Sequence, residues 1–451
     1  MKFLIRGIHV PHRKNTADIE PARISPPPFV VLPMSMHIGR PATPEVKPGD
    51  HVDVGQRVGA QNGFISSSIY ASVSGTVKKC DDILLSSGSY CPAVMIESDG
   101  LMTPYSEIRP PEVVDRESFI AAVRESGVVG LGGAGFPTYV KFAVDDPKKI
   151  EELIINGAEC EPYITSDTRT MIDRADEIEE GISLIMKYLG ISKVIIAVEK
   201  NKPKAIARMR EIESRIDGVK VKTLPSSYPQ GGEKVIIYNT TGKIVPPGKL
   251  PIDLGSLVCN CTTVAAIARY VKTGMPLTEK TLTVDGGAVK NPTNLIVPIG
   301  TPVEYVFEAA GGFSEAPAKV LYGGPMMGIA IPDISAPVLK NTNALLALTE
   351  RESKTPKETA CIRCGSCVNN CPLGLRSTDI SIAYKARDGA ALKALHTLTC
   401  MECGCCSYVC PAKKPLVQTN KLAKQMLREY IEKEKKAAEE EKAYAESVKK
   451  R

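Results

Sequence analysis

Eight cysteines near the C-terminus carry the clearest chemistry in this sequence. They form two runs with the spacing C-x2-C-x2-C-x3-C-P, written CIRCGSCVNNCP and CMECGCCSYVCP. In runs of this kind, three thiolates wrap one [4Fe–4S] cluster, and the fourth, placed before proline, reaches the other cluster. The spacing therefore predicts two clusters, one held by Cys361, Cys364, Cys367 and Cys410, and the other by Cys400, Cys403, Cys406 and Cys371.

A structural zinc site is the alternative for these cysteines. Zinc prefers CxxC pairs at longer separation, and two four-cysteine runs that each end in proline disfavour it. Cys405 lies inside the second run but off its spacing, and it is expected to be a free thiol. The chain lacks a signal-peptide pattern, so its fourteen cysteines are not expected to form a disulfide framework. Two adjacent clusters predict that single electrons pass from one cluster to the other.

A second candidate site is the glycine-rich stretch GVVGLGGAGFPTYVKF, residues 127–142. Gly130, Gly132 and Gly135 match the dinucleotide pattern G-x-G-x-x-G, which should follow a buried strand. The preceding residues instead predict an amphipathic helix with Asp115 as its N-cap, so a dinucleotide loop of that kind is disfavoured. Such a loop can still present several N–H groups to a phosphate or a flat ring. The alternative is a mobile loop without a ligand.

Polar residues follow several predicted strands and turns between positions 150 and 265. A buried strand at residues 153–155 leads into Asn156, Glu159 and Glu161. Ligands often bind where strands end in α/β folds, and carboxylates bind ribose hydroxyls. An ordinary turn with solvated acids is the alternative. Further candidates precede apolar runs: Gly231, Gly232 and Glu233, then Asn260 and Thr262.

These segments resemble, in order, the flavin- and NADH-binding subunit of respiratory complex I. The matching stretches are GLGGAGFPTYVK, NGAECEP, YPQGGEK and CNCTTVAAI. The resemblance implies an FMN site that exchanges hydride with NAD(H), with Glu159 and Glu233 closest to the chemistry. The implied pocket residues are Gly130, Gly132, Gly133, Lys141, Asn156, Glu159, Gly231, Glu233, Asn260 and Thr262. Leu131, Ala158 and Gly232 depart from the family pattern, chiefly where nicotinamide would bind.

The flanking regions predict an α/β multidomain protein. Residues 30–100 have the short β segments of a lipoyl-like barrel-sandwich, but residues 61–74 contain no lysine for a swinging arm. Residues 281–312 resemble the β-grasp domain that accompanies the complex I flavin domain. The C-terminal residues from 428 predict a charged, solvated helix. The expected units are a barrel-sandwich at 1–105, an FMN/NADH α/β domain at 115–275, a β-grasp domain at 276–345, a two-cluster ferredoxin-like α domain at 350–425, and a helical tail at 426–451.

Across nearly its whole length the chain resembles the C subunit of the Rnf complex, a membrane-bound ion-translocating ferredoxin:NAD oxidoreductase. The resemblance implies a peripheral subunit at the cytoplasmic face of the cell membrane, whose partners are membrane subunits and a ferredoxin-like electron carrier. Nucleic acid is not an expected partner, because the net charge of +6 is scattered and tryptophan is absent. His9, His12 and His37 are expected to be structural or surface residues. Two alternatives remain: a soluble flavin/iron–sulfur reductase, such as a cobalamin reductase, and a non-catalytic electron-wire subunit.

Overall fold

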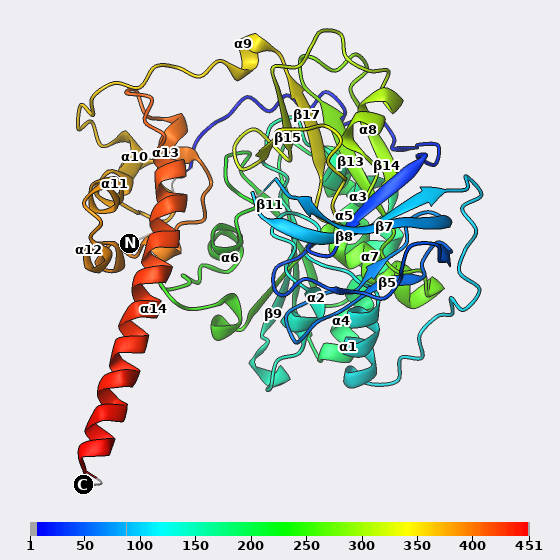
Figure 1. Ribbon diagram of the computed structural model, residues 1–451, viewed down its shortest axis with the longest axis horizontal. Helices are drawn as coiled ribbons and strands as arrows, with labels where there is room; N and C mark the ends of the chain where they lie inside the picture. Colours follow the sequence, from blue (N-terminus) through cyan, green and yellow to red (C-terminus); the bar gives the residue numbers. More distant parts are fainter. Residues whose placement is uncertain (1–6, 87, 450–451) are drawn as a thin grey trace.

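The N-terminal unit is a two-layered β structure. The computed structural model describes residues 7–86 and 88–449 (Figure 1). One layer has four strands in the order β2-β8-β7-β4, and the other has three in the order β3-β5-β6. Alternate apolar side chains such as Val30, Leu32 and Val94 meet between the layers, as expected for half-buried strands. The strands are β2 (Phe29–Pro33), β3 (Thr43–Pro44), β4 (His51–Val52), β5 (Arg57–Ala60), β6 (Ile69–Tyr70), β7 (Gly75–Leu84) and β8 (Tyr90–Ser98).

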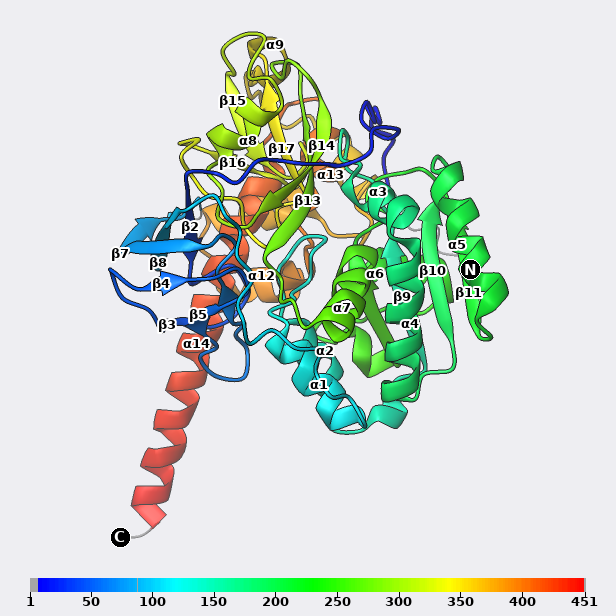
Figure 2. The same ribbon diagram turned by 90° about the vertical axis from the view of Figure 1, so that its right-hand side faces the viewer.

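The second unit is a parallel sheet covered on both faces (Figure 2). Its strand order is β11-β10-β9-β12, with β9 (Glu152–Gly157), β10 (Val194–Glu199), β11 (Val219–Leu224) and β12 (Ser256–Asn260). Helices α1, α4, α5 and α7 pack on one face, and α6 packs on the other. Coverage of both faces explains the continuous apolar runs of β9 and β10. The helices are α1 (Arg116–Glu125), α4 (Ala175–Leu189), α5 (Pro203–Arg215), α6 (Glu233–Thr241) and α7 (Cys261–Thr273).

The glycine-rich loop follows a helix of this unit, as the sequence predicts, and a second helix that the sequence did not predict follows the loop. Asp115 caps α1 and forms a reciprocal capping box with Ser118. After the loop, α2 (Thr138–Phe142) begins directly behind Pro137. Helix α3 (Ser166–Asp173) follows the strand-end turn of β9, and the short 3-10 helices η1 (Pro147–Lys149) and η2 (Pro251–Leu254) lead into strands. The loop is therefore held by helices at both ends.

The third unit is a mixed sheet in the order β1-β14-β13-β17-β15-β16, packed against α8 (Val303–Ala309). Its outermost strand, β1 (Ala22–Arg23), comes from the N-terminal arm and pairs in parallel with β14 (Thr293–Pro298). The predicted boundary at residue 345 falls inside β17 (Ala344–Leu348). The other strands are β13 (Glu279–Asp285), β15 (Lys319–Tyr322) and β16 (Ile329–Ile331).

The rest of the N-terminal arm runs over the parallel-sheet unit. Ile8 exchanges two backbone hydrogen bonds with Tyr228. Arg13 forms an ion pair with Glu352, with 2.8 Å between the guanidinium and the carboxylate. The described part of the arm thus contacts three later regions.

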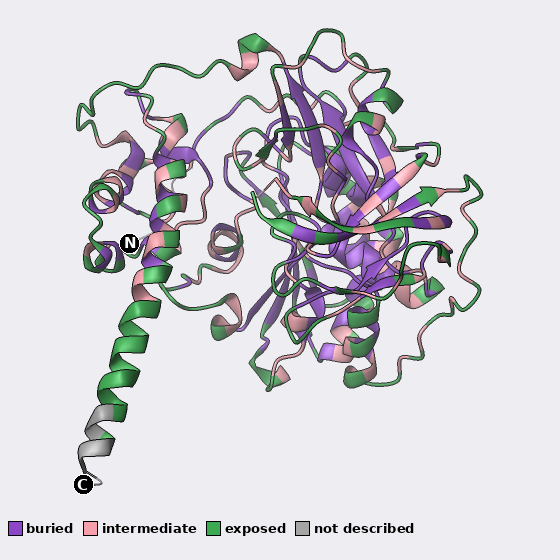
Figure 3. Cartoon of the chain, viewed as in Figure 1, coloured by how far each residue is buried: buried purple, intermediate pink, exposed green. Residues whose placement is uncertain are grey.

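The cysteine-rich unit is helical and leads into the long helix α14 (Leu416–Lys449). Helices α11 and α12 pack against the first turns of α14, whereas its residues 432–443 are exposed (Figure 3). The predicted boundary at 425/426 falls within this helix. The short helices are α9 (Glu350–Ser353), α10 (Ser366–Asn369), α11 (Ser377–Lys385), α12 (Gly389–Ala394), η3 (Thr397–Thr399) and α13 (Cys405–Tyr408). Within the described residues, no helix combines the length and the apolar character that a membrane span needs.

Candidate functional site

The strand order of the parallel sheet marks a candidate ligand site, called the crevice, at the carboxyl ends of β9 and β12. The chain proceeds from β9 to β10 and β11 on one side and returns to β12 on the other, so the order reverses between β9 and β12. Ligands of open parallel sheets bind at such a reversal, beyond the carboxyl ends of the strands. Asn156 and Asn260 are paired across the two strands at that edge. The structure thus brings two sequence-predicted residues to the position where α/β sheets bind ligands.

The glycine-rich loop lies over this edge and offers unused hydrogen-bond donors. Leu131 donates its N–H to the hydroxyl of Thr263 at 2.9 Å, which ties the loop to the start of α7. In the described part of the chain, no acceptor is found for the N–H groups of Gly132, Gly133 and Ala134. Three consecutive free N–H groups fit an anionic group such as a phosphate.

The two central glycines of the loop have different surroundings. A Cβ at Gly132 would lie 2.5 Å from the side-chain nitrogen of Asn260, so this glycine allows the asparagine to approach. A Cβ at Gly133 would have no protein atom within 4 Å. Gly133 therefore faces open space, and it is the position where the backbone can lie against a ligand.

The rim of the crevice carries a lysine and a carboxylate. Lys141 of α2 lies 3.1 Å from the Glu233 carboxylate and donates to the carbonyl of Val258 at 3.1 Å. Asn156 donates to the carbonyl of Gly231 at 2.9 Å, which fixes the turn before α6. Both charged side chains of the rim are partly exposed and can contact a ligand.

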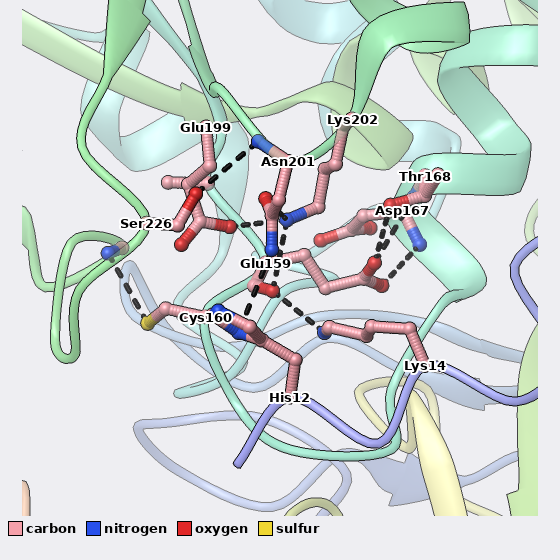
Figure 4. Close-up of polar contacts among 12 residues, drawn as sticks. His12, Lys14, Glu159, Cys160, Asp167, Thr168, Glu199, Asn201, Lys202 and Ser226 are labelled. Carbon is pink, nitrogen blue, oxygen red and sulfur yellow. Dashed lines mark hydrogen bonds and ion pairs between the residues drawn. The ribbon is translucent and has the colours of Figure 1, made fainter. Parts of the chain in front are cut away.

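The resemblance implies that Glu159 and Thr262 line the pocket. In the structure, both lie beneath the rim instead. The Glu159 carboxylate accepts hydrogen bonds from the N–H of Asp167 at 2.7 Å and from the hydroxyl of Thr168 at 2.7 Å (Figure 4). Thr262 donates its hydroxyl to the Asp167 carboxylate at 2.7 Å, and Asn260 donates to the same carboxylate at 2.7 Å. Burial raises the pKa of Glu159 to about 7, against the opposing charge of Lys14. These side chains support the crevice rather than line it.

Two lysines that the sequence did not single out hold the strand-end turn after β9. Lys14 of the N-terminal arm donates to three backbone carbonyls, those of Glu159 and Glu161 at 2.8 Å and that of Ile164 at 2.5 Å. Lys202 donates to the Glu159 carbonyl at 3.2 Å and forms a buried ion pair with Glu199 (Figure 4). Lys14 thus supplies donors to three carbonyls of the turn, and the Glu159 carbonyl accepts from both ammonium groups.

A third lysine reaches the glycine-rich loop from the neighbouring unit. Lys280 of β13 is 2% exposed and donates to the carbonyl of Leu131 at 3.0 Å. Burial lowers the pKa of Lys280 to about 8. The Leu131 side chain itself is buried in the core of the parallel-sheet unit. The six-stranded sheet therefore helps to shape the loop.

Several of the predicted cysteine ligands lie close together across the two runs, and Cys406 shares an apolar cluster with Cys367 and Cys410. Cys371, from the first run, lines one cavity together with Cys400, Cys403 and Cys406 of the second run. In the first run, Cys367 lies in one apolar cluster with Cys410, the last cysteine of the second run. Cys405 is fully buried in the wall of the same cavity as Cys403. In the described residues, no three Cys, His, Asp or Glu side chains converge on a point that could hold a single metal ion.

The second cysteine run lies directly against the crevice unit. The Tyr228 hydroxyl donates to the carbonyl of Cys403 at 2.7 Å. A Cβ at Gly232 would lie 1.9 Å from the terminal methyl of Met401, so the methionine occupies the space that a larger residue would need. The turn that carries Glu233 and the loop that carries Cys400 and Cys403 are thus in contact.

Of the predicted structural histidines, His37 and His12 lie beside groups outside the cysteine runs, whereas His9 stands between Ile8 and Val10, which share an apolar cluster with Cys403 and Cys405. His37 is buried in the barrel-sandwich, where its Nε2 lies 2.9 Å from the carbonyl of Arg40 and 3.1 Å from the N–H of Ser67. His12 Nδ1 lies 3.5 Å from the side-chain amide of Asn201.

Four family models match the chain in the order of its units. They are described as the RnfC barrel sandwich hybrid domain over residues 2–101, the Nuo51 FMN-binding domain over 123–269, the SLBB domain over 281–330, and a 4Fe-4S dicluster domain over 360–414. The crevice residues fall within or beside the second match, and all eight cysteines fall within the fourth. The chain therefore contains an FMN-binding domain and an iron–sulfur domain.

Full-length relatives agree with this order. The C subunit of the Na(+)-translocating ferredoxin:NAD(+) oxidoreductase complex of Acetobacterium woodii is 43% identical over 379 residues, covering 83% of this chain and 86% of the relative. The proton-translocating counterpart of Clostridium ljungdahlii is 40% identical, covering 85% and 84%. The C subunit of the ion-translocating oxidoreductase complex of Rhodobacter capsulatus is 40% identical, covering 95% and 84%. Because this similarity spans the full set of units, the chain belongs to the family formed by the C subunits of ion-translocating ferredoxin:NAD(+) oxidoreductase complexes.

Proposed function

We propose that this chain exchanges hydride with NAD(H) through a bound FMN and passes single electrons through two [4Fe–4S] clusters. It does so as the peripheral subunit of an ion-translocating ferredoxin:NAD oxidoreductase, at the cytoplasmic face of the membrane. Its partners are membrane subunits of the complex and a ferredoxin-like electron carrier. The observation that carries the proposal is the contact between the crevice and the second cysteine run, made by Tyr228 with Cys403 and by Gly232 with Met401.

The residues of the crevice fit FMN. The free N–H groups of Gly132, Gly133 and Ala134 suit its phosphate, and the open space at Gly133 admits its body. Asn156 and Lys141 lie at the same edge and offer polar contacts. When bound, FMN supplies the change from two-electron hydride chemistry to one-electron transfer.

The predicted catalytic residues take separate roles in this proposal. Glu233 is partly exposed on the rim and is the candidate contact for NAD(H). Glu159 acts as a positioning residue: it holds the start of α3 and, through Asp167, orients Asn260 and Thr262.

The departures from the complex I pattern do not weaken the crevice. Leu131 points into the core and contributes only its backbone to the loop. The small Gly232 gives room for Met401 of the cluster loop. Ala158 is buried against the face of the sheet that α6 covers. These substitutions therefore give little support to an electron wire that has lost nucleotide binding.

The same contacts give an order to the clusters. A cluster held by Cys400, Cys403, Cys406 and Cys371 would lie beside the crevice and would be the one to exchange electrons with the flavin. A cluster held by Cys361, Cys364, Cys367 and Cys410 would be the more distant one.

We further assign the lipoyl-like and β-grasp folds to the first and third units, on the basis of their strand arrangement and the matched domains.

An anaerobic NADH titration of the purified, reconstituted protein tests the proposal. We expect flavin and iron–sulfur absorbance to bleach together, with NADH consumed in proportion to the electrons taken up. If clusters and flavin bleach with dithionite but not with NADH, the chain is an electron wire. If NADH reduces the protein and membrane partners are never recovered with it, the soluble reductase is the better description.

A further inference from the structure

The two predicted cluster sites differ in the solvent exposure of their cysteines. At the second site, Cys403 and Cys406 are buried and Cys371 and Cys400 are partly covered. At the first site, Cys367 and Cys410 are also buried, but Cys361 and Cys364 are exposed, as are all eleven residues from 354 to 364. Ile362, between these two cysteines, is 68% exposed. A single exposed apolar side chain is common on protein surfaces, so the charges around this loop decide what it can bind.

Positive charge surrounds this exposed loop. Residues 354–364 and 410–414 contain five cations and one carboxylate. The two segments lie side by side, because Thr359 donates its N–H to the carbonyl of Ala412 at 3.0 Å. The single carboxylate, Glu358, is neutralised by an ion pair with Lys414. The remaining cations are Lys354, Lys357, Arg363 and Lys413.

We propose that this surface, defined as residues 354–364 with 410–414, is where a carboxylate-rich one-electron protein docks and exchanges electrons with the first cluster. Opposite charge on the two surfaces speeds encounter, and Ile362 supplies an apolar centre inside a charged rim. With both clusters bound, electrons would pass between the crevice and the docked protein by way of the buried second cluster and the exposed first one. The inference rests on the proposed function for its direction, but its docking surface can be tested without NADH.

A rival exit exists beside the second cluster. A cleft with a volume of 610 Å³ lies between α6 and the cysteine-rich unit, and Cys371 and Arg376 are among the residues that line it. If electrons left through this cleft, the rate of electron transfer to the partner would depend on the charge of Arg376 and not on the charges of the exposed loop.

The test uses the full-length protein with both clusters reconstituted, reduced by dithionite, and two small probes. Soluble cytochrome b5 is the acidic acceptor and cytochrome c the basic one. The variant Lys357→Glu/Lys413→Glu reverses two charges of the surface and leaves Arg363, between two predicted ligands, unchanged. Lys47→Glu/Lys290→Glu is the matched control, because both lysines are exposed on other units. Arg376→Glu tests the rival cleft. Iron content is measured first for each variant.

At low ionic strength, about 10 mM, where charges act over about 30 Å, we expect the docking-surface variant to reduce cytochrome b5 at least about tenfold more slowly than wild type. Reduction of cytochrome c should become faster, and added salt should remove both effects. Calorimetric titration of the oxidised proteins should show a matching loss of affinity for cytochrome b5. The control variant should behave as wild type.

Two results would overturn the docking surface. One is a docking-surface variant with full iron content whose rates and affinities stay within about twofold of wild type, well below the tenfold effect that charge steering gives. The other is an Arg376→Glu variant that produces the loss instead. Neither result depends on NADH, so a protein that NADH fails to reduce would contradict the proposed function while leaving the docking surface testable.

Discussion

Replacing Lys280 by methionine should weaken flavin binding although Lys280 lies in another unit. Its ammonium is 3.0 Å from the Leu131 carbonyl and is the contact through which β13 holds the glycine-rich loop. With a pKa near 8, Lys280 is protonated at neutral pH. Methionine has a similar length, remains apolar and cannot donate to the carbonyl. The variant therefore removes the contact without removing the packing.

The size of the effect follows from the kind of hydrogen bond that is lost. A hydrogen bond to a charged group contributes about 1.5–3 kcal/mol, which is about a 10- to 150-fold change in an equilibrium constant. If the loop must be ordered before the flavin binds, losing this contact lowers the fraction of protein in which the loop is ordered. The apparent Kd for the flavin then rises by the same factor. The free energy of unfolding should change less, because the variant also removes the desolvation cost of a buried charge.

Fluorescence titration of flavin-free protein measures the dissociation constants of FMN and of riboflavin. We expect both ligands to lose affinity by a similar factor, because the effect passes through the loop backbone rather than the phosphate. Lys290→Met, an exposed lysine of the same unit, is the matched control. An unchanged Kd for FMN in a folded variant would refute the reasoning, and a loss confined to FMN would show instead that the charge acts on the phosphate.

Three further outcomes are expected. Gly133→Val should abolish FMN binding but keep the thermal stability of wild type, since its side chain would enter space free of protein atoms; a destabilised protein would show that the space is not a ligand site. Anaerobically reconstituted protein should contain about eight iron atoms; Cys405→Ser should retain them and Cys410→Ser should lose or labilise one cluster, whereas zinc in place of iron would contradict the assignment. Burial lowers the pKa of His37 from 6.5 to about 4. The free energy of unfolding should therefore fall as the pH drops through this interval, by about 3 kcal/mol at about 1.4 kcal/mol per pKa unit. His37→Gln should flatten that part of the profile in denaturant titrations at each pH, and an equally steep profile would show that another group titrates.

Local spacing made much of the architecture predictable. The cysteine pattern depends on a short turn around a metal cluster, and the structure groups Cys371 with the second run as that pattern requires. The Asp115 cap and the helix before the glycine loop follow from residues only a few positions apart. Asn156 could be identified because it ends a buried apolar strand.

The supporting groups could not be predicted, because they come from distant parts of the chain. Lys14 and Lys280 are lysines with ordinary neighbours in sequence, and only the tertiary fold buries them against backbone carbonyls. Asp167 was missed for the same reason, although it links Asn260 and Thr262. Glu159 was identified, but no local signal shows that its carboxylate turns inward to the start of α3.

The N-terminal arm imposes a condition on how the protein can be made. Its residues leave the ribosome well before their partners Tyr228, the strand β14 and Glu352, which are synthesised hundreds of residues later. Contacts between such distant positions form slowly, so the arm must stay unpaired through most of translation. The crevice turn held by Lys14 therefore cannot reach its final form until the later units exist. Tags or deletions at the N-terminus should consequently impair maturation of the flavin site, far from the point where the chain is altered.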